Sequence, residues 1–528
     1  MKKTSFKISD IRDRIIPFLA FVSVYLFDLL YIIRRGRRLL DSDMASELVL
    51  SDVLNREHSI LGLSSSWYYS TEIKALGLQM FYRLGLVFFP HNWLAARTFG
   101  MAIALMLFAA AVILLLRTKD GNCKWGFFAA ALCLAPGGSW YFWQTIFGGF
   151  YLVYILISLY TLVFIRYFVQ AKGRAVSRIL YIAGIVILGV GSGENGIKQL
   201  MVFYAPLVLA LIILVLWDVH RLADVSEDLR KDKLREMTSP KYLLLALTGA
   251  VSSFAGYLIN ICILVRKYSF KDYNETLIIP GNMWERLREY IWSFGFNQNI
   301  KLMSFAGIAA MVGVLIGVTT LVTGVWLVCR LGKLESFDRV LALTCAVSIA
   351  FGVFVFSYTP SSGIQYYQSF VPEGLFLIVL FVKSFEYTFE KLRNVMVYVF
   401  IGCMLLASAG TVLSETDKPL HYYRAEEYMA SYVDYVRLLG YEQGVSTFWK
   451  SNLITELSNG EIEMWTILSS GDPVIQEWLQ KKSHNDALPQ GKYFYLISVT
   501  EYPSDAFAAE HPELEMIYSD DKYVIFGN

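Results

Sequence analysis

The sequence has few charged residues for its length. Asp, Glu, Lys and Arg make up 17% of its 528 residues, whereas hydrophobic residues make up 55% and aromatic residues 15%. This composition is too apolar for a soluble chain. The 47 basic and 45 acidic residues nearly cancel to a net charge of +2, which gives no support for a nucleic-acid partner. We therefore expect a membrane protein.

Patterns typical of disulfides, metal sites and secretion signals are also missing. The six cysteines all fall within or at the edges of apolar segments, without paired ligand spacing, and we interpret them as small buried hydrophobes. His58, His91 and His421 are isolated. The apolar run from Ile15 to Ile33 is too long for a signal peptide and is followed by arginines instead of a cleavage site. We assign it as the first membrane span.

Long apolar segments are abundant. A membrane span needs roughly 20 mainly apolar residues, and hydropathy predicts about eleven such segments, with no long soluble interruption among them. The expected fold is a polytopic α-helical membrane protein of about 11 transmembrane helices. The expected spans lie near residues 15–33, 93–116, 125–142, 149–165, 179–192, 200–217, 242–264, 303–328, 340–358, 371–389 and 395–413.

The distribution of basic residues predicts the topology. Lys and Arg collect in the loops that follow even-numbered spans, whereas loops 136–148 and 359–370 contain none. The positive-inside rule then places the N-terminus in the cytoplasm and, after an odd number of spans, the C-terminus outside. The cluster Arg34–Arg38 is an exception that falls outside. We attribute it either to the competing basic N-terminal segment or to contact with anionic lipid.

The composition changes near Leu413, where charge rises and apolar runs shorten. We expect residues 1–413 to form the transmembrane domain, with long outer loops 34–92 and 266–302, and residues 414–528 to form a small extracytoplasmic α/β domain. In that outer domain we expect helices at 426–439 and 473–481, strands at 445–449 and 492–500, and a strand pair within 514–526.

The first outer loop carries acids and a lysine. Asp41 and Asp43 follow the first span, and Glu72 and Lys74 lie further along the same loop. On a helix, Asp43 shares a face with Glu47. A carboxylate at a membrane surface can act as a general base toward an acceptor hydroxyl, or it can hold a divalent cation against phosphate oxygens. These residues are our first candidates for catalysis.

Helix capping is the alternative explanation for both groups. We expect helices at 45–54 and 74–86 with apolar faces in the membrane interface. The two aspartates would complement the first turn of the former, and Ser70 or Thr71 would cap the latter, with Lys74 in solvent. The sequence alone leaves catalysis and capping open.

Other segments supply candidate binding residues. Gly191–Lys198 interrupts a hydrophobic hairpin, either as a polar turn or as a site where Lys198 binds phosphate as a point charge. Arg266 and Lys267 open the second outer loop, which also contains an aromatic and charged interfacial helix at 284–292. Aromatic residues at 140–144 and 358–368 fit sugar rings, isoprenoid chains or an interfacial belt.

These features together resemble the GT-C superfamily of polyprenyl-phosphate-dependent membrane glycosyltransferases, in particular the protein mannosyltransferase and aminoarabinose transferase group. Asp41-Ser42-Asp43 matches the acidic first-loop motif, and Glu72-Ile73-Lys74 resembles the Glu-Lys-Pro that follows it. Lys198 with Pro206 resembles a Thr-Lys-Gly element that has a proline at similar spacing. Two departures are Ala75 in place of the motif proline and a loop between the third and fourth spans without the acid that several relatives keep.

The resemblance implies an inverting hexosyltransferase that passes a sugar from a polyprenyl-phosphate donor to a glycan, lipid or protein acceptor on the outer face of the cytoplasmic membrane. Asp43 and Asp41 would be catalytic, and both are also our candidate ligands for a divalent cation. Membrane lipid is an implied partner and nucleic acid is not. The implied substrate-binding residues are Glu72, Lys74, Glu194, Lys198, Arg266, Lys267, Gln365 and Tyr366.

Two other classes fit the same composition. A lipid or polysaccharide transporter or flippase would usually show internal repeats and titratable residues near the middle of spans. This sequence shows no internal repeat, and its acids collect in outer loops. A non-catalytic envelope-assembly membrane protein would tolerate the loss of both first-loop aspartates.

Overall fold

The computed structural model of the protein divides into two compact units. Unit 1 comprises residues 1–28, 104–259 and 275–420, and unit 2 comprises residues 29–103, 260–274 and 421–528. The structure describes residues 8–60, 62–135, 137–171, 174–222, 237–270, 281–295, 301–359, 363–385, 389–417 and 425–528.

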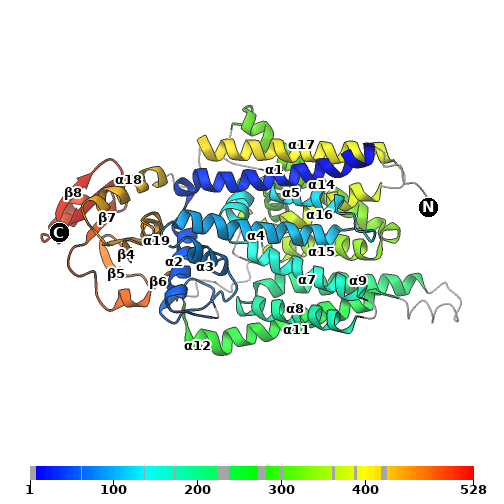
Figure 1. Ribbon diagram of the computed structural model, residues 1–528, viewed down its shortest axis with the longest axis horizontal. Coiled ribbons are helices and arrows are strands. Elements are labelled where there is room, and N and C mark those ends of the chain that lie inside the picture. Colours follow the sequence, from blue (N-terminus) through cyan, green and yellow to red (C-terminus); the bar gives the residue numbers. More distant parts are fainter. Residues whose placement is uncertain are drawn as a thin grey trace. The chain divides into compact units, whose positions relative to one another are not determined.

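Unit 1 is a bundle of helices (Figure 1). Helices α1 (Ile8–Leu39) and α4 (Trp93–Leu116) each continue from one unit into the other. The remaining helical elements of unit 1 are α5 (Lys124–Leu134), α6 (Ser139–Tyr141), the π-helix η1 (Phe142–Phe147), α7 (Leu152–Gln170), α8 (Ala175–Glu194), the π-helix η2 (Leu200–Tyr204), α9 (Ala205–Arg221), α11 (Ser239–Ile259), α13 (Met283–Trp292), α14 (Phe305–Cys329), the 3-10 helix η4 (Leu331–Lys333), α15 (Ser336–Phe356), the 3-10 helix η5 (Ile364–Phe370), α16 (Val371–Ser384) and α17 (Glu390–Asp417).

Among the described residues, nine helices are long and apolar enough to cross a membrane. They match nine of the expected spans, which confirms a polytopic α-helical membrane protein. The remaining two expected spans, 125–142 and 371–389, correspond to the shorter apolar helices α5, of 11 residues, and α16, of 14 residues. The α13 helix confirms the helix expected at 284–292.

Proline ends α5 and begins α16. The expected span at 125–142 breaks at Ala135, which is extended with φ −65° and ψ 120°. This residue precedes Pro136 in the sequence, and a residue before proline disfavours the helical conformation. At the other helix, Pro372 lies in the first turn of α16, where the missing N–H costs no intrahelical hydrogen bond.

Glycines in the segment 191–198 serve helix packing more than turning. Helix α8 continues to Glu194, and Gly193 lies against α11 so closely that a Cβ there would be 1.9 Å from the Ser253 carbonyl oxygen. Gly256 of α11 meets the Val190 carbonyl oxygen in the same way, at 2.1 Å. Small residues let membrane helices approach closely. Only Gly196, with φ +107°, needs the left-handed conformation of a turn.

Unit 2 combines segments from three parts of the chain. The first outer loop forms α2 (Ser42–Arg56), β1 (Trp67–Tyr69) and α3 (Gln79–Phe88). The second outer loop adds the π-helix η3 (Asn260–Leu264), α12 (Val265–Lys267) and β2 (Ser269–Phe270). The C-terminal segment adds α18 (Ala425–Leu438), β3 (Gln443–Thr447), α19 (Phe448–Leu457), β4 (Glu463–Ser469), β5 (Asp472–Ile475), β6 (Gln480–Lys481), the 3-10 helix η6 (Lys482–Asn485), β7 (Phe494–Ser498), α20 (Ser504–Glu510), β8 (Glu515–Ser519) and β9 (Tyr523–Gly527).

A small sheet joins these three segments. Strand β1 pairs in parallel with β2 and antiparallel with β6. Because a strand needs neighbours to satisfy its backbone N–H and C=O groups, β1 fixes the second outer loop and the C-terminal segment beside the first outer loop. The loop and the C-terminal segment are therefore one structural unit despite their distance in sequence.

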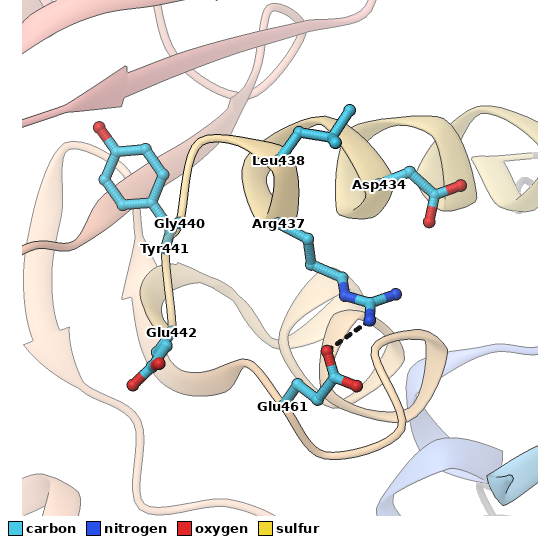
Figure 2. Close-up of a pocket in the computed structure, with 7 residues that line it drawn as sticks. All are labelled: Asp434, Arg437, Leu438, Gly440, Tyr441, Glu442 and Glu461. Carbon is cyan, nitrogen blue, oxygen red and sulfur yellow. Dashed lines mark ion pairs between the residues drawn. The ribbon is translucent and has the colours of Figure 1, made fainter. Parts of the chain in front are cut away.

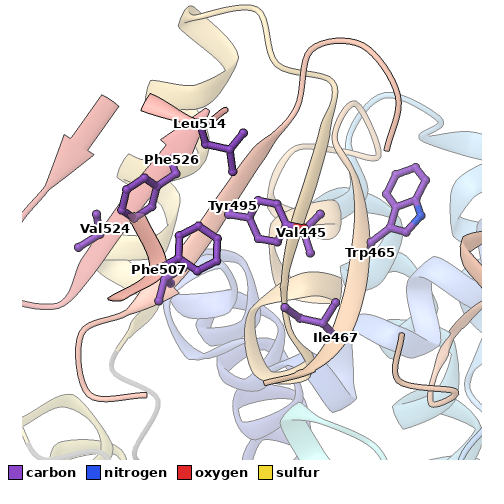
Figure 3. Close-up of a cluster of buried hydrophobic side chains, with 9 residues drawn as sticks. Val445, Trp465, Ile467, Tyr495, Phe507, Leu514, Val524 and Phe526 are labelled. Carbon is purple, nitrogen blue, oxygen red and sulfur yellow. The ribbon is translucent and has the colours of Figure 1, made fainter. Parts of the chain in front are cut away.

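The C-terminal segment is a small α/β domain with a six-stranded sheet in the order β5-β4-β3-β7-β9-β8. Strand β3 runs parallel to β4 and β7, and the remaining pairs are antiparallel. One face carries a buried hydrophobic cluster closed by Phe507 of α20 (Figure 3). The opposite face meets α18, where Tyr432 contacts Tyr523 at 5.1 Å between ring centroids. The cluster consists of Val445, Trp465, Ile467, Tyr495, Ile497, Phe507, Leu514, Val524 and Phe526.

Most of the elements expected in this domain are confirmed, including the strand pair in 514–526, which forms β8 and β9. The helix expected at 473–481 is wrong, because this stretch contains the short strands β5 and β6. Strand β5 extends the six-stranded sheet and β6 pairs with β1. Pairing of β5 with the neighbouring β4 and of β6 with the distant β1 therefore overrode the local pattern.

A buried ion pair ties the C-terminal domain to the start of α4 within unit 2. The Nη2 and Nε atoms of Arg97 each donate to the Glu456 carboxylate at 2.6 Å, and the two side chains are 1% and 5% exposed. Arg97 also donates to the Met44 carbonyl oxygen in α2 at 2.8 Å and to the Tyr82 hydroxyl in α3 at 3.1 Å. One guanidinium thus connects α2, α3, α4 and α19.

Replacing Glu456 with Gln should destabilise the protein strongly, because it leaves the Arg97 charge buried without its partner. Breaking a buried pair typically costs about 3–5 kcal/mol. The control is Glu461→Gln, whose ion pair with Arg437 is largely exposed and should contribute less than about 1 kcal/mol. Thermal unfolding of the full-length protein in nanodiscs measures both variants. Equal losses of stability would contradict the prediction.

Candidate active site

The two first-loop aspartates have different structural roles. Asp41 is the N-cap of α2, with an extended backbone and a side-chain oxygen 2.7 Å from the Met44 backbone N–H that donates to it. The capping interpretation is therefore confirmed for Asp41. Asp43 lies two residues further on, in the first turn of the helix, and is not the N-cap. Capping at Asp41 fixes where α2 begins and so sets the direction of the Asp43 side chain.

Asp43 and Glu47 lie one turn apart on α2, both half-buried, and Lys74 is close enough to influence both carboxylates. Most other residues of α2 are buried. The structure thus brings Asp43 and Lys74 together, two residues that are 31 positions apart in the sequence. A like-charge pair with one nearby cation is an arrangement typical of functional sites.

The surroundings of Asp43 raise the pKa of its carboxyl group to about 6. Burial has the largest effect, since it disfavours the charged form. The positive charge of Lys74 opposes this rise, and the negative charge of Glu47 adds to it. Asp43 is therefore a weak acid that ionises just below neutral pH and can exchange a proton there.

Glu47 is a site residue that the sequence reasoning did not assign. Burial raises the pKa of its carboxyl group, whereas Lys74, Arg97 and a hydrogen bond from the Gln79 backbone N–H lower it. The available signal was its position one turn after Asp43, on the same helical face. Its contact with Lys74 depends on how the loop folds back, which spacing along α2 does not reveal.

Gln79 holds the loop that carries Lys74. Its side chain is fully buried, and its Nε2 donates to the Lys74 carbonyl oxygen at 2.7 Å and to the Gly62 carbonyl oxygen at 3.4 Å. The Ser51 hydroxyl of α2 donates to the Gln79 carbonyl oxygen at 3.1 Å. One glutamine therefore fixes Lys74 relative to α2. We did not predict this positioning role of Gln79 from the sequence.

The capping alternative for the second group is wrong. Helix α3 begins at Gln79, with Leu78 as a cap that makes no side-chain hydrogen bond. Ser70 and Thr71 lie well before it, and Glu72 lies half-buried in the preceding loop. Lys74 is half-buried instead of fully solvated.

The other expected binding residues of unit 2, Arg266 and Lys267, are exposed on the short helix α12. The Lys267 ammonium lies 5.4 Å from the centroid of the Tyr268 ring, and Tyr268 packs edge-on against Tyr69 of β1 at 6.1 Å. Strand β2 follows directly and pairs with β1. The structure thus places this basic pair beside the first outer loop.

The remaining expected binding residues belong to unit 1. Glu194 ends α8 and is half-buried. The Lys198 ammonium lies over two aromatic rings, at 4.6 Å from the Tyr151 centroid and 5.1 Å from the Tyr154 centroid. Such cation–π contacts hold the lysine in place. Gln365 and Tyr366 are half-buried in η5.

The expected divalent cation has no preformed cage in the described part of the chain. There, no three or more His, Cys, Asp or Glu side chains are grouped to hold a metal ion. Asp41 already uses an oxygen to cap α2. A metal at Asp43 would need further ligands from a bound substrate. The divalent cation therefore stays a prediction.

The C-terminal domain contains a separate cavity of about 820 Å³. Figure 2 shows the Arg437 side chain extending toward Glu461, with 2.5 Å between its Nη2 and the Glu461 Oε2. The Tyr441 ring points away from this pair and is 5% exposed. The cavity is lined by Asp434, Arg437, Leu438, Gly440, Tyr441, Glu442 and Glu461. It includes none of the site residues expected from the sequence.

Comparison with known proteins identifies the fold. No protein-family model and no curated protein matches the chain. Among solved structures, ArnT from Cupriavidus metallidurans bound to undecaprenyl phosphate matches over 96% of this chain and 97% of its own, with 12% identity and a TM-score of 0.58. The chain therefore shares the overall fold of this ArnT structure.

Two further structures accompany this match. The apo state of the same ArnT gives a TM-score of 0.56 at 12% identity, with the same 96% and 97% coverage. The apo oligosaccharyltransferase from Archaeoglobus fulgidus matches 84% of this chain and 64% of its own at 15% identity, with a TM-score of 0.44. At these identities the likeness to ArnT establishes the fold alone.

Replacing Asp43 with Asn should stabilise the protein at neutral and alkaline pH. A carboxyl group whose pKa is higher in the folded state than its ordinary value of 3.8 favours folding when protonated, so stability falls as pH rises from about 4 through about 6. A neutral Asn avoids this loss, worth at most roughly 3 kcal/mol for a half-buried group.

Thermal unfolding from pH 4 to pH 8 tests this expectation. The Tm of Asp43→Asn should exceed that of the wild type above pH 6, and the two should converge near pH 4. The matched control is Asp52→Asn on the same helix, where Asp52 pairs with Arg56 on a more exposed side and the change should give no stabilisation. A wild-type Tm that stays highest throughout would contradict the assignment.

Proposed function

We propose that this protein is a membrane glycosyltransferase that transfers a sugar from a polyprenyl-phosphate donor to an acceptor hydroxyl. The observation that carries the proposal is the grouping of Asp43, Glu47 and Lys74 in the loop after the first span. The GT-C fold supports it, since the ArnT structure of that fold is bound to undecaprenyl phosphate. We place this chemistry on the outer face of the membrane, with the N-terminus in the cytoplasm and the C-terminal domain outside.

Asp43 is the general base in this proposal. With a pKa of about 6, it is mostly ionised at neutral pH and still basic enough to accept a proton from an acceptor hydroxyl. The acceptor oxygen then forms a bond to the anomeric carbon of the sugar, the carbon–oxygen bond to the phosphate breaks, and the polyprenyl phosphate leaves with the electron pair. A single displacement of this kind inverts the anomeric centre.

The basic residues stabilise the leaving phosphate. Negative charge develops on the phosphate oxygen as the sugar bond breaks, so a nearby cation lowers the barrier. We assign Lys74 and the pair Arg266 and Lys267 of unit 2 to this role, and Lys198 of unit 1 remains a candidate for contact to the donor. Glu72, Glu194, Gln365 and Tyr366 remain candidates for contacts to the donor or acceptor.

Asp41 acts as a positioning residue. Its side chain fixes the first turn of α2, and that turn carries Asp43. Glu47 raises the proton affinity of Asp43. The acceptor, whether glycan, lipid or protein, is selected by surfaces around this site, and the C-terminal domain belongs to the same compact unit as the first loop.

Asp43→Asn should abolish sugar transfer while expression and thermal stability remain at least as high as in the wild type, because the amide accepts no proton. Purified protein in nanodiscs, incubated with radiolabelled polyprenyl-phosphate sugars with and without EDTA, measures loss of label from the donor. The control Asp52→Asn should retain activity. Wild-type turnover by Asp43→Asn would refute the role of this residue, and movement of intact donor across the membrane would favour a flippase.

The pH dependence of transfer should follow the charges around Asp43. In the wild type, kcat/KM should rise with pH and level off above about pH 6, as Asp43 becomes ionised. Glu47→Gln removes a charge that raises the pKa of Asp43, so the midpoint should move lower. Lys74→Met removes a charge that lowers this pKa, so the midpoint should move higher. Each shift should be about one pH unit.

Initial rates from pH 5 to pH 9 measure the three midpoints. Shifts in opposite directions for the two variants are the result that an electrostatic role predicts and a purely structural role does not. Midpoints that move in the same direction, or that stay fixed while the rate falls, would show that Asp43 is not the group that titrates.

A further inference from the structure

A small cavity lies inside the helical bundle of unit 1. It has a volume of about 20 Å³ and lies among α7, η2, α15, η5 and α16, with a mostly apolar lining that includes several polar residues. This volume is enough for a single water molecule or ion, and too little for a sugar or a lipid headgroup. The polar residues that line it are Ser158, Gln199, Thr344, Ser369 and Glu373.

Three buried oxygens of these residues have no hydrogen-bond partner. They are Gln199 Oε1, Thr344 Oγ1 and Glu373 Oε2. The side chains of Gln199 and Thr344 are 1% and 2% exposed. Unpaired polar atoms inside a membrane bundle are strongly unfavourable, because neither water nor lipid tails can satisfy them. Three such atoms around one cavity indicate that the cavity holds an occupant.

The occupant must be electron-poor. The Gln199 amide is fixed in orientation because its Nε2 donates to the Tyr154 carbonyl oxygen at 3.0 Å and to the Ser158 hydroxyl at 2.6 Å. Its remaining oxygen can only accept. The Glu373 Oε1 accepts from the Ser348 hydroxyl at 3.2 Å, and its Oε2 is an acceptor when ionised. The cavity is therefore lined by oxygen atoms that seek a donor or a cation.

The charge of Glu373 distinguishes a cation from water. No Lys, Arg or His lines the cavity, and within the described ranges Glu373 forms no ion pair with a basic side chain. A carboxylate in apolar surroundings must be neutralised by a proton or by a bound cation. A proton on Oε2 supplies one hydrogen bond, whereas a cation can coordinate all three oxygens at once.

Irregular helical segments border the cavity. Gln199 directly precedes the π-helix η2, an irregularity that often marks functional sites. Glu373 lies in the first turn of α16, directly after the 3-10 helix η5. Side chains of both segments line the cavity.

We propose that Glu373, Gln199 and Thr344 bind one monovalent alkali cation in unit 1. A single charge matches the single carboxylate, whereas a divalent ion would leave one charge uncompensated. The bound cation holds α7, η2, α15 and α16 together. This site is independent of the transfer chemistry proposed above.

The cation dependence of thermal stability tests the proposal. Full-length protein in nanodiscs is unfolded in choline chloride, and choline is replaced stepwise by NaCl or KCl at constant ionic strength and pH. A ligand that binds the folded state raises the Tm in a saturable manner, and we expect a shift of about 3 °C or more for the wild type. Glu373→Gln should lose this dependence. The control Glu335→Gln, at an exposed glutamate of unit 1, should keep it.

Two outcomes would overturn the proposal. One is a wild-type Tm that does not depend on Na⁺ or K⁺, including a Tm that depends on pH alone and so indicates a proton. The other is a cation-dependent shift that persists in Glu373→Gln.

Direct binding keeps the proposal testable if Glu373→Gln does not fold. Wild-type protein should bind ²²Na⁺ saturably at one site per chain, and unlabelled NaCl or KCl should displace it. Thr344→Val preserves side-chain shape but removes one ligand oxygen, so it should weaken binding at least about fivefold. Absence of saturable binding, or binding unchanged by Thr344→Val, would reject the site.

Discussion

The Arg97 guanidinium is the interaction on which the architecture of unit 2 depends. It is almost fully buried, and its hydrogen-bond acceptors lie in three different helices: Glu456 in α19, Met44 in α2 and Tyr82 in α3. A buried guanidinium must be satisfied on all sides, because each unmade hydrogen bond carries the full cost of desolvation. This requirement allows few arrangements of the four helices. It therefore fixes α2, and with it Asp43, relative to the rest of the unit.

The electrostatics of the candidate site follow from this fixed position. Burying α2 brings two carboxylates of one helical face out of bulk water, which raises the pKa of each. Lys74 lowers the pKa of both carboxyl groups, and Arg97 lowers that of Glu47. The pKa of about 6 for Asp43 is therefore a balance of burial against charge that no one of these residues produces alone.

Much of the fold was predictable from the sequence, since membrane spans depend on local composition. Nine expected spans were confirmed because runs of about twenty apolar residues have no alternative structure in lipid. Of the two short helices, α5 ends before Pro136, a local limit that average hydropathy does not detect, and α16 begins where expected but ends at Ser384. The expected helix at 473–481 was wrong for another reason: strands β5 and β6 depend on partners in β4 and β1, and a local pattern carries no information about them.

The sequence by itself determined the order of the apolar helices and the presence of a C-terminal α/β domain, and it led us to propose the loop after the first span as the place for chemistry. These properties depend on composition and on short motifs, and they hold wherever the segments lie in space. Only the tertiary structure decided that Asp41 caps a helix while Asp43 does not, that Glu47 belongs with Asp43 and Lys74, and that Gln79 and Arg97 hold them. The physical reason is that desolvation and charge–charge interaction depend on distance in space, and the fold alone sets those distances.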